Sequence, residues 1–401
     1  MSEISGQEQQ YSKTRVGLML AAVMMMVVIS GFGNFKFVPM QNSIMDFFHI
    51  QESAYGYLNT ASGWATVLCA VPFGFLVRKL RCNVSIIIGI SVAAVGIFIQ
   101  ATTTSFVVMV IGRVIEGAGS SFAGLVTAAL TLNLVNPKRL SFWSSVFVVA
   151  TIMPQVIMAK GGTALMINSG LSFQQIFRII AFIYLGAIIV WLILVPFSLK
   201  IHGVGSSVKP TREQTLRVIK NKSNWLVAIA NIFFNLVSIT FTAYIIKYLM
   251  TKGLTQHSAA NYYSITTILG LASMIIFGIL SDKLKTKRKI AVMSCFAAAV
   301  SFVLLAVLPG NLIIIYVLVW GTLPRSVAVM VQSSSADIAE VPTDIPIVNS
   351  VKSTIMQVGS IITGILLGYM IQYLGYDISI FVLAGGMVIA AILWMLAKRI
   401  P

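Results

Sequence analysis

The sequence predicts an all-α membrane protein with twelve transmembrane helices in two pseudo-symmetric six-helix bundles. Hydrophobic residues make up 58% of its 401 residues and charged residues only 10%, against roughly 25% charged in a typical soluble domain. The apolar residues fall into runs of about 20, the length that a helix needs to cross a bilayer. Polar, basic or turn-forming breaks separate these runs, and the longest break lies near the middle of the chain. This pattern excludes an ordinary soluble enzyme, a secreted domain and a disordered protein.

Each predicted span is an apolar run between two such breaks. The first half of the chain holds spans near residues 17–40, 54–77, 84–101, 106–132, 141–164 and 175–198. The second half holds spans near residues 225–250, 257–280, 290–308, 311–335, 346–373 and 378–397. The clearest breaks are Arg78 to Arg81, Asn136 to Arg139, Pro309 to Asn311 and Gly375 to Asp377. We expect the first span to be retained, because it lacks the small-residue cleavage site of a signal peptide.

The positive residues orient these spans. The chain has 28 Lys and Arg against 11 Asp and Glu, a net charge of +17. With the N-terminus inside, most of the bases fall in cytoplasmic loops, as the positive-inside rule requires; Lys247 and Lys252 fall at the outer ends. The sequence therefore predicts a multi-pass inner (plasma) membrane protein with both termini cytoplasmic. Because topology accounts for the charge, we expect the lipid bilayer as a partner and no nucleic acid.

The polar stretch in the middle divides the chain into two halves. We predict an N-terminal six-helix bundle over residues 1–199, a cytoplasmic linker over 200–224 and a C-terminal six-helix bundle over 225–401. Within the linker, Arg212 to Lys222 is predicted to form a short helix on the inner membrane face.

A short motif occurs at the same place in both halves. Gly74, Leu76, Lys79, Leu80 and Arg81 at the inner end of the second span match Gly278, Leu280, Lys283, Leu284 and Lys285 at the inner end of the eighth. Glycine allows two helices to approach closely, and the bases favour the inner leaflet. A repeat in matching positions indicates an internal duplication.

Here the sequence resembles the major facilitator superfamily, whose two six-helix halves carry a Gly-x-Leu-x-Asp motif followed by bases in these loops. The second copy matches well, with Gly278, Asp282 and Lys283, whereas Arg78 stands where the first copy should have Asp. The resemblance implies a secondary transporter in which two bundles rock about a central site, with the motif residues acting in the conformational change.

A second resemblance lies in the fourth span. Arg113 and Gly117 match the Arg-x-x-x-Gly pattern of the family. The Gly-x-x-x-Gly-Pro cluster of the family's antiporters is absent from the fifth span, where Met153, Pro154 and Gln155 stand. This departure disfavours a typical proton-coupled drug exporter.

Six bases and one acid fall within or at the ends of spans. The bases are Lys36, Arg113, Lys160, Arg178, Arg325 and Lys352, and the acid is Glu116. Intramembrane charges cost about 2.5–3.5 kcal/mol each even on a lenient scale, so they are expected to be paired or functional. One carboxylate cannot neutralise six bases. The surplus positive charge predicts water or a bound anion.

Each of these bases also has a structural interpretation. Arg113 and Glu116 are spaced for an ion pair along one helix. Lys36, Lys160 and Lys352 are near enough to span ends to extend toward the interface, and Arg178 suits an interface anchor. Arg325 lies mid-span and is the hardest to explain in this way.

The residues and the resemblance together predict a transporter of a small anion, an organic carboxylate, that is monomeric, is not an enzyme and needs no cofactor or metal. The predicted substrate-binding residues are Arg113, Arg325, Lys36, Lys160, Lys352, Asn231, Asn235, Tyr57, Trp64 and Gln357. The resemblance implies that spans 1, 2, 4, 5, 7, 8, 10 and 11 line the central cavity. Further polar or aromatic residues on these spans are Gln155, Tyr244, Tyr262, Tyr263 and Trp320. Glu116 is the candidate proton carrier if transport is proton-coupled. The alternative is an exporter of neutral or hydrophobic compounds, or of drugs, on the same fold.

Overall fold

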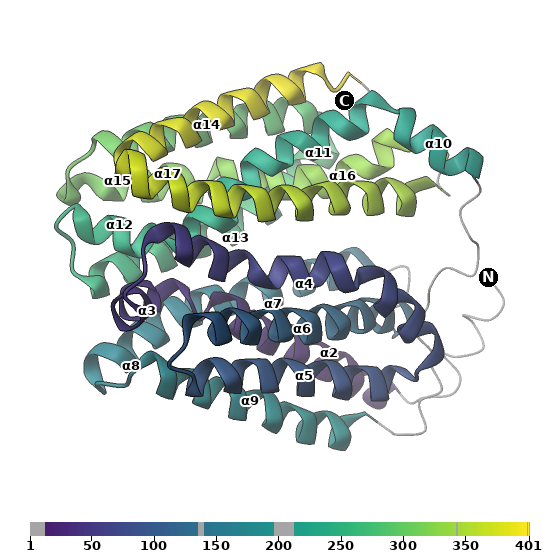
Figure 1. The fold of residues 1–401 in the computed structure, drawn as a ribbon. Coiled ribbons are helices and arrows are strands. Elements are labelled where there is room, and N and C mark those ends of the chain that lie inside the picture. Colours follow the sequence, from purple (N-terminus) through teal and green to yellow (C-terminus); the bar gives the residue numbers. More distant parts are fainter. Residues whose placement is uncertain (1–12, 135–139, 196–211, 342–343, 399, 401) are drawn as a thin grey trace. The chain divides into compact units, whose positions relative to one another are not determined.

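The structure is a computed structural model that describes residues 13–134, 140–195, 212–341, 344–398 and 400. These residues form helices joined by short turns, with no β-strand element among them (Figure 1). Within that part of the chain, nine helices are long and apolar enough to cross a membrane. The prediction of an all-helical membrane protein is confirmed.

The predicted spans coincide with helices, and their number stays a prediction. The last of the nine helices, Ile347–Leu396, contains two predicted spans. Gly375, with φ 79° and ψ 172°, interrupts the helix between them, at the break that the sequence predicted. Helix α4 (Glu52–Lys79) and the segment from α7 (Leu140–Ile157) to α8 (Thr163–Asn168) correspond to predicted spans that are not among the nine.

By their contacts, the residues form two compact units. The first contains Met1–Lys36, Trp64–Ile157 and Leu165–Ser207, and the second contains Phe37–Gly63, Met158–Ala164 and Val208–Pro401. Two N-terminal segments thus belong with the C-terminal residues. Within the second unit, Lys247 Nζ lies 2.8 Å from Glu52 Oε1, and Gln256 Nε2 donates to the Pro39 carbonyl at 3.0 Å. The predicted sequence-continuous bundles, 1–199 and 225–401, remain a prediction.

The first unit is built around a close pair of helices. Its main elements are α2 (Lys13–Phe35), most of α4, α5 (Cys82–Thr102), α6 (Phe106–Leu134), α7 and α9 (Phe173–Leu194). Helix α5 packs on α6 and on α9. A Cβ on Gly96 would lie 2.4 Å from the Glu116 nitrogen, and a Cβ on Gly119 would lie 2.4 Å from the Ala93 nitrogen. Glycine at these positions lets the two backbones touch.

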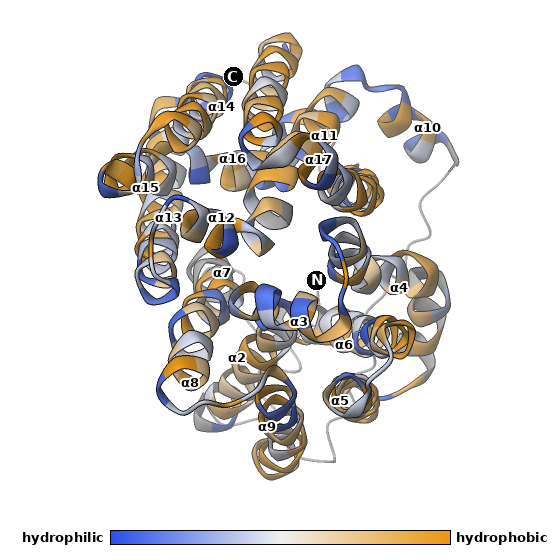
Figure 2. Ribbon diagram, turned by 60° about the vertical axis from the view of Figure 1, so that its left-hand side comes forward, coloured by the Kyte–Doolittle hydropathy of each residue, from blue (hydrophilic) through white to orange (hydrophobic). Residues whose placement is uncertain are grey.

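Helix α9 has one buried face and one exposed face, and both are apolar. It buries Phe177, Tyr184 and Trp191 on one side and exposes Phe182 and Ile193 on the other, Ile193 by 75%. In Figure 2 the helix is mostly coloured as hydrophobic. An apolar side chain gains nothing from facing water, so the exposed face is suited to lipid.

The second unit holds the remaining helices. They are η1 (Val38–Met40), α3 (Gln41–Phe48), η3 (Met158–Gly162), α10 (Arg212–Lys220), α11 (Lys222–Asn235), η4 (Leu236–Thr240), η5 (Phe241–Ala243), α12 (Ile245–Thr251), α13 (Gln256–Leu284), α14 (Lys287–Val307), η6 (Gly310–Leu312), α15 (Ile313–Gly321), η7 (Leu323–Ser326), α16 (Val327–Ile338) and α17 (Ile345–Leu396). Helices α11 and α14 both pack on α17, and α13 packs on α15 and η7. Helix α10 confirms the short helix predicted in the linker.

Three predicted spans are interrupted rather than continuous. The fifth passes through the π-helix η3 after Pro154, the seventh through η4 and η5, and the tenth through the 3-10 turn η7. Proline removes a helical hydrogen-bond donor and clashes with the preceding turn. This effect explains the break after Pro154 and the break at η7, which contains Pro324. The first predicted span likewise ends early, at Phe35, before the 3-10 turn that contains Pro39.

Replacing Gly96 with alanine should lower the thermal stability of the protein. Its new Cβ would meet backbone atoms of α6 within 2.6 Å, so the two helices would have to separate. Overpacking of this kind costs about 1–3 kcal/mol. Thermal unfolding of the purified protein in detergent measures the effect. Gly186→Ala on α9 is the matched control, because nothing lies within 4 Å of its added Cβ; equal melting temperatures for the two variants would contradict the close α5–α6 crossing.

Candidate functional site: a buried ion cluster and an arginine beside an aromatic cavity

The first unit contains a buried cluster of charges centred on Glu116. Lys36 Nζ lies 2.6 Å and Arg113 Nη1 2.9 Å from Glu116 Oε2. Gln100 Nε2 donates to the same oxygen at 2.8 Å. The side chains of Lys36, Arg113 and Glu116 are each exposed by 3% or less. The i, i+3 ion pair proposed for Arg113 and Glu116 is therefore present, with Lys36 added to it.

Four helices hold these groups together. Arg113 and Glu116 lie one turn apart on α6, Gln100 lies on α5, and Lys36 follows the last residue of α2. The Lys36 ammonium also lies 4.8 Å from the centre of the Phe177 ring on α9. The cluster thus joins α6 to α2, α5 and α9.

The backbone of α2 is shaped to fit the cluster. Arg113 Nη1 donates to the Gly33 carbonyl at 3.1 Å. A Cβ on Gly33 would lie 2.4 Å from Glu116 Oε1, so a side chain at this position would displace the carboxylate. Two cations and one anion leave the cluster with a formal charge of +1.

Arg325 lies in the second unit, without an ion pair in the described residues. It is 7% exposed, and its Nε and Nη2 atoms are buried without a hydrogen-bond acceptor. Its guanidinium carbon lies 5.3 Å from the centre of the Trp320 ring. A buried polar group without a partner costs about 1–3 kcal/mol, and a charged one more.

The break in the tenth predicted span determines the position of Arg325. It lies in η7, directly after the point at which α15 ends at Gly321. A Cβ on Gly270 of α13 would lie 2.8 Å from Arg325 Cγ, so the glycine makes room for the arginine stem. Ser273 Oγ on α13 donates to the Thr322 carbonyl, which the broken helix leaves without its usual partner. Discontinuous helices of this kind form ligand sites in many transporters.

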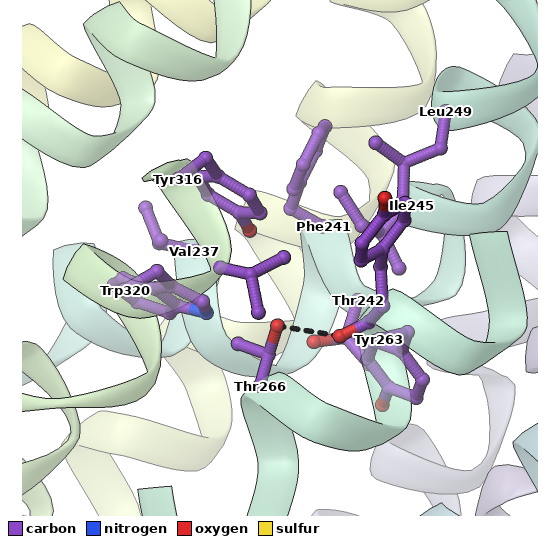
Figure 3. Close-up of a pocket in the computed structure, with 11 residues that line it drawn as sticks. Val237, Phe241, Thr242, Ile245, Leu249, Tyr263, Thr266, Tyr316 and Trp320 are labelled. Atoms are coloured by element: carbon purple, nitrogen blue, oxygen red, sulfur yellow. Dashed lines mark hydrogen bonds between the residues drawn. The ribbon is translucent and has the colours of Figure 1, made fainter. Parts of the chain in front are cut away.

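A narrow cavity is lined in part by Trp320, the residue whose ring lies next to the Arg325 guanidinium. Figure 3 shows the residues that line this cavity. Its wall is aromatic and apolar with a few hydroxyls, and its lining residues are Val237, Phe241, Thr242, Ile245, Leu249, Tyr262, Tyr263, Thr266, Tyr316, Val317 and Trp320. Its empty space, including the part open to solvent, totals about 320 Å³. About 10 Å³ of this admits the centre of a water molecule, close to the minimum for one water. The cavity is therefore too narrow in this conformation to admit more than about one water.

The interrupted seventh span supplies much of that wall. Val237 lies in η4, Phe241 and Thr242 in η5, and Ile245 at the start of α12. The Thr266 hydroxyl on α13 donates to the Tyr262 carbonyl of its own helix at 2.8 Å, the dashed line in Figure 3. That hydroxyl therefore keeps its oxygen available as an acceptor.

Lys352 lies in the same unit but has a full set of acceptors. Its ammonium donates to the Val331 carbonyl at 2.7 Å, to Ser334 Oγ at 3.3 Å and to Ser335 Oγ. These bonds tie α17 to α16. The side chain is buried and is not among the residues that line the cavity.

The other predicted binding residues lie on several elements, and none of them lines the cavity beside Trp320. Asn231 and Asn235 are buried on α11, and Gln357 is half-buried on α17. Tyr57 is exposed, with its hydroxyl 3.3 Å from that of Tyr369. Trp64 and Lys160 are exposed as well, Lys160 in the π-helix η3.

The repeated motif lies at the C-terminal ends of α4 and α13. Gly278 faces α16, because its added Cβ would meet Val329 Cγ1 at 3.3 Å. Lys283 is exposed. The side chains of Gly74, Arg78 and Asp282 lie outside the described residues. The sequence did not predict a further ion pair, between Lys287 and Asp337 at 3.0 Å. It links the start of α14 to the end of α16.

Sequence reasoning missed several residues of both sites. Gln100 gives no sequence signal, because it meets Glu116 only through the crossing of α5 and α6. Phe241, Thr242 and Tyr316 resemble ordinary residues of an apolar span. Of the further polar and aromatic residues named from the sequence, Tyr262, Tyr263 and Trp320 line this cavity, whereas Gln155 and Tyr244 are not among its lining residues.

Comparisons with known proteins agree on the fold. The model of the Major Facilitator Superfamily matches residues 23–341. A bacterial homolog to the human lysosomal transporter Spinster, solved in an inward-facing and occupied conformation, superposes with a TM-score of 0.80 at 14% identity, covering 98% of each chain. The nucleoside transporter NupG superposes with a TM-score of 0.76 at 13% identity, covering 95% of this chain and 99% of that one. Among curated proteins, none matches this sequence.

The charge balance of the cluster predicts unequal effects for two substitutions. Glu116→Gln leaves two buried cations without a counter-ion, whereas Lys36→Met leaves Arg113 and Glu116 as a neutral pair. Removing one partner of a buried ion pair costs about 3–5 kcal/mol when a charge is left uncompensated. We therefore expect Glu116→Gln to lower the melting temperature in detergent much more than Lys36→Met. Equal losses would show that the net charge of the cluster does not govern its stability.

Proposed function

The chain belongs to the major facilitator superfamily, and from this premise we propose that it is a secondary transporter of a small organic anion, a carboxylate. Substrate would move by alternating access, with the bundles 1–199 and 225–401 rocking about a central site and 200–224 connecting them. It would act as a multi-pass inner-membrane protein with cytoplasmic termini. The fold supports transport in general, and the buried charges support the choice of substrate.

The observation that carries the substrate proposal is the environment of Arg325. The other buried bases of the described residues have acceptors: Lys36 and Arg113 with Glu116, and Lys352 with three oxygens of α16. Arg325 has two buried donor atoms with none. A bound anion would satisfy both and neutralise a charge that is expensive inside a membrane.

A second function, export of a neutral or hydrophobic compound, is favoured by the cavity wall. Its lining residues carry hydroxyls but no charged groups, and the similar NupG structure is that of a nucleoside transporter. Arg325 would then donate hydrogen bonds to a neutral acceptor. However, a neutral substrate would leave the positive charge of Arg325 uncompensated. For this reason we prefer the anion transporter to the exporter of neutral compounds.

Glu116 is the proposed proton carrier if transport is coupled to protons. Its carboxylate holds Lys36, Arg113 and Gln100 on one oxygen. Protonation of Glu116 would weaken the ion pairs and the hydrogen bond that connect α6 to its neighbours. Proton binding would in this way change the packing of the helices. Exchange or uniport needs no such step.

Replacing Arg325 with glutamine should greatly reduce anion uptake. A hydrogen bond to a charged group contributes about 1.5–3 kcal/mol, and about 1.4 kcal/mol corresponds to a tenfold change. The loss of two such bonds should therefore slow uptake at low substrate concentration by about tenfold or more. Uptake of labelled carboxylates into proteoliposomes measures it. The exposed Arg178→Gln is the control and should transport normally. Undiminished uptake by Arg325→Gln, in protein that elutes as a single species, would contradict the assignment.

A further inference from the structure

The two donors that Arg325 leaves unsatisfied lie on one edge of its guanidinium. Both Nε and Nη2 are buried, and neither has a hydrogen-bond acceptor in the part of the chain that the structure describes. In arginine, the N–H of Nε and one N–H of Nη2 run parallel on the side away from Cδ. This spacing matches the two oxygens of a carboxylate, which binds such an edge with two parallel hydrogen bonds.

The rest of the side chain is already fixed. The guanidinium lies over the ring of Trp320 at 5.3 Å, and the stem lies against α13 at Gly270, where a Cβ would come within 2.8 Å of Cγ and 3.3 Å of Nε. The contacts with Trp320 and with α13 restrict the side chain and so preorganise its donor edge. Preorganisation of this kind reduces the entropy lost on binding.

The neighbouring cavity has the chemistry of a ring-binding site. Trp320 connects Arg325 to the cavity, because its ring contacts the Arg325 guanidinium and also lines the cavity. Phe241, Tyr262, Tyr263 and Tyr316 complete an aromatic lining, and aromatic faces pack well against another aromatic ring. In the described conformation the space holds about one water, so a ring would enter as these side chains move apart.

The charges of the second unit suit a single carboxylate. Lys352 is bound to α16, Lys247 pairs with Glu52 and Lys252 with Asp377. Among its described buried bases, Arg325 alone retains buried donors without acceptors. A second carboxylate on the same ligand would enter an apolar cavity without a counter-ion, at a large desolvation cost.

We propose that the substrate is an aromatic monocarboxylate, with its carboxylate bound side-on by Nε and Nη2 of Arg325 and its ring in the cavity beside Trp320. The inference rests on the proposed function and narrows its substrate class. Arg325 is thus a binding residue that requires an arginine and not merely a positive charge.

Binding of three small probes to the purified full-length protein tests the proposal. By isothermal titration calorimetry, benzoate should bind, whereas its neutral isostere benzamide and the dicarboxylate succinate should bind at least about tenfold more weakly, one decade being about 1.4 kcal/mol. Arg325→Lys keeps the charge but cannot present two parallel N–H groups, so it should lose benzoate affinity by about tenfold or more, the loss expected from one charge-assisted hydrogen bond. Arg178→Lys is the matched control and should bind as the wild type does.

A spectroscopic readout separates this role from a structural one. Carboxylate binding at a guanidinium stacked on Trp320 should change the tryptophan fluorescence of the wild type. Trp320→Phe should bind benzoate more weakly in the calorimeter, and saturating benzoate should no longer cause that fluorescence change. Thermal unfolding of each variant confirms that it is folded.

The outcomes distinguish the inference from the proposed function. Uptake of carboxylates that is equally good in Arg325→Lys, or a preference for succinate, would leave anion transport intact and overturn the side-on monocarboxylate site. Binding of benzamide and other neutral compounds as tightly as benzoate, with no carboxylate uptake into proteoliposomes, would overturn both. Benzoate binding that is lost in Arg325→Lys and kept in Arg178→Lys would support both.

Discussion

The free energy of holding a positive charge inside an apolar bundle is the constraint on which the rest of this structure depends. A lysine or arginine at this depth must find acceptors, because hydrocarbon supplies none. The protein meets the constraint in three different ways: Lys36 and Arg113 share the carboxylate of Glu116, Lys352 uses a backbone carbonyl and two serine hydroxyls, and Arg325 stacks on Trp320 and leaves one edge unpaired. Pairing ties helices together, whereas the unpaired edge is available to a ligand.

The backbone follows from the same constraint. Gly33 has no side chain because the carboxylate of Glu116 occupies that space, and Gly270 has none because the stem of Arg325 does. Around Arg325 the tenth span breaks after Gly321 and resumes at Val327, and the seventh breaks from Leu236 to Ala243. Irregular backbone at membrane depth is tolerated where protein or a cavity surrounds it. The breaks and the charged side chain therefore occur together for a physical reason.

Much of the fold could be predicted from the sequence, because hydropathy and turn residues act locally. The break at Gly375, the short helix after Arg212 and the Arg113–Glu116 pair all follow from neighbouring residues. Contacts across the chain could not be predicted in this way: nothing local shows that Lys36 reaches Glu116, 80 positions away, or that Gln100 joins them. The break in η7 has a sequence signal in Gly321 and Pro324, whereas the break at η4 has none, since Leu236 to Thr240 contains neither glycine nor proline.

The site shows why a count of charges is a weaker guide than their partners. Six bases against one acid predicted water or a bound small anion among all of them. Once acceptors are assigned, the ion cluster retains a formal charge of +1, Lys352 is fully bound to α16, and Lys160 and Arg178 are exposed. What remains at the aromatic cavity is one guanidinium edge with two parallel donors. An edge with two parallel donors suits one carboxylate, and the largely aromatic wall nearby favours an apolar remainder of the ligand.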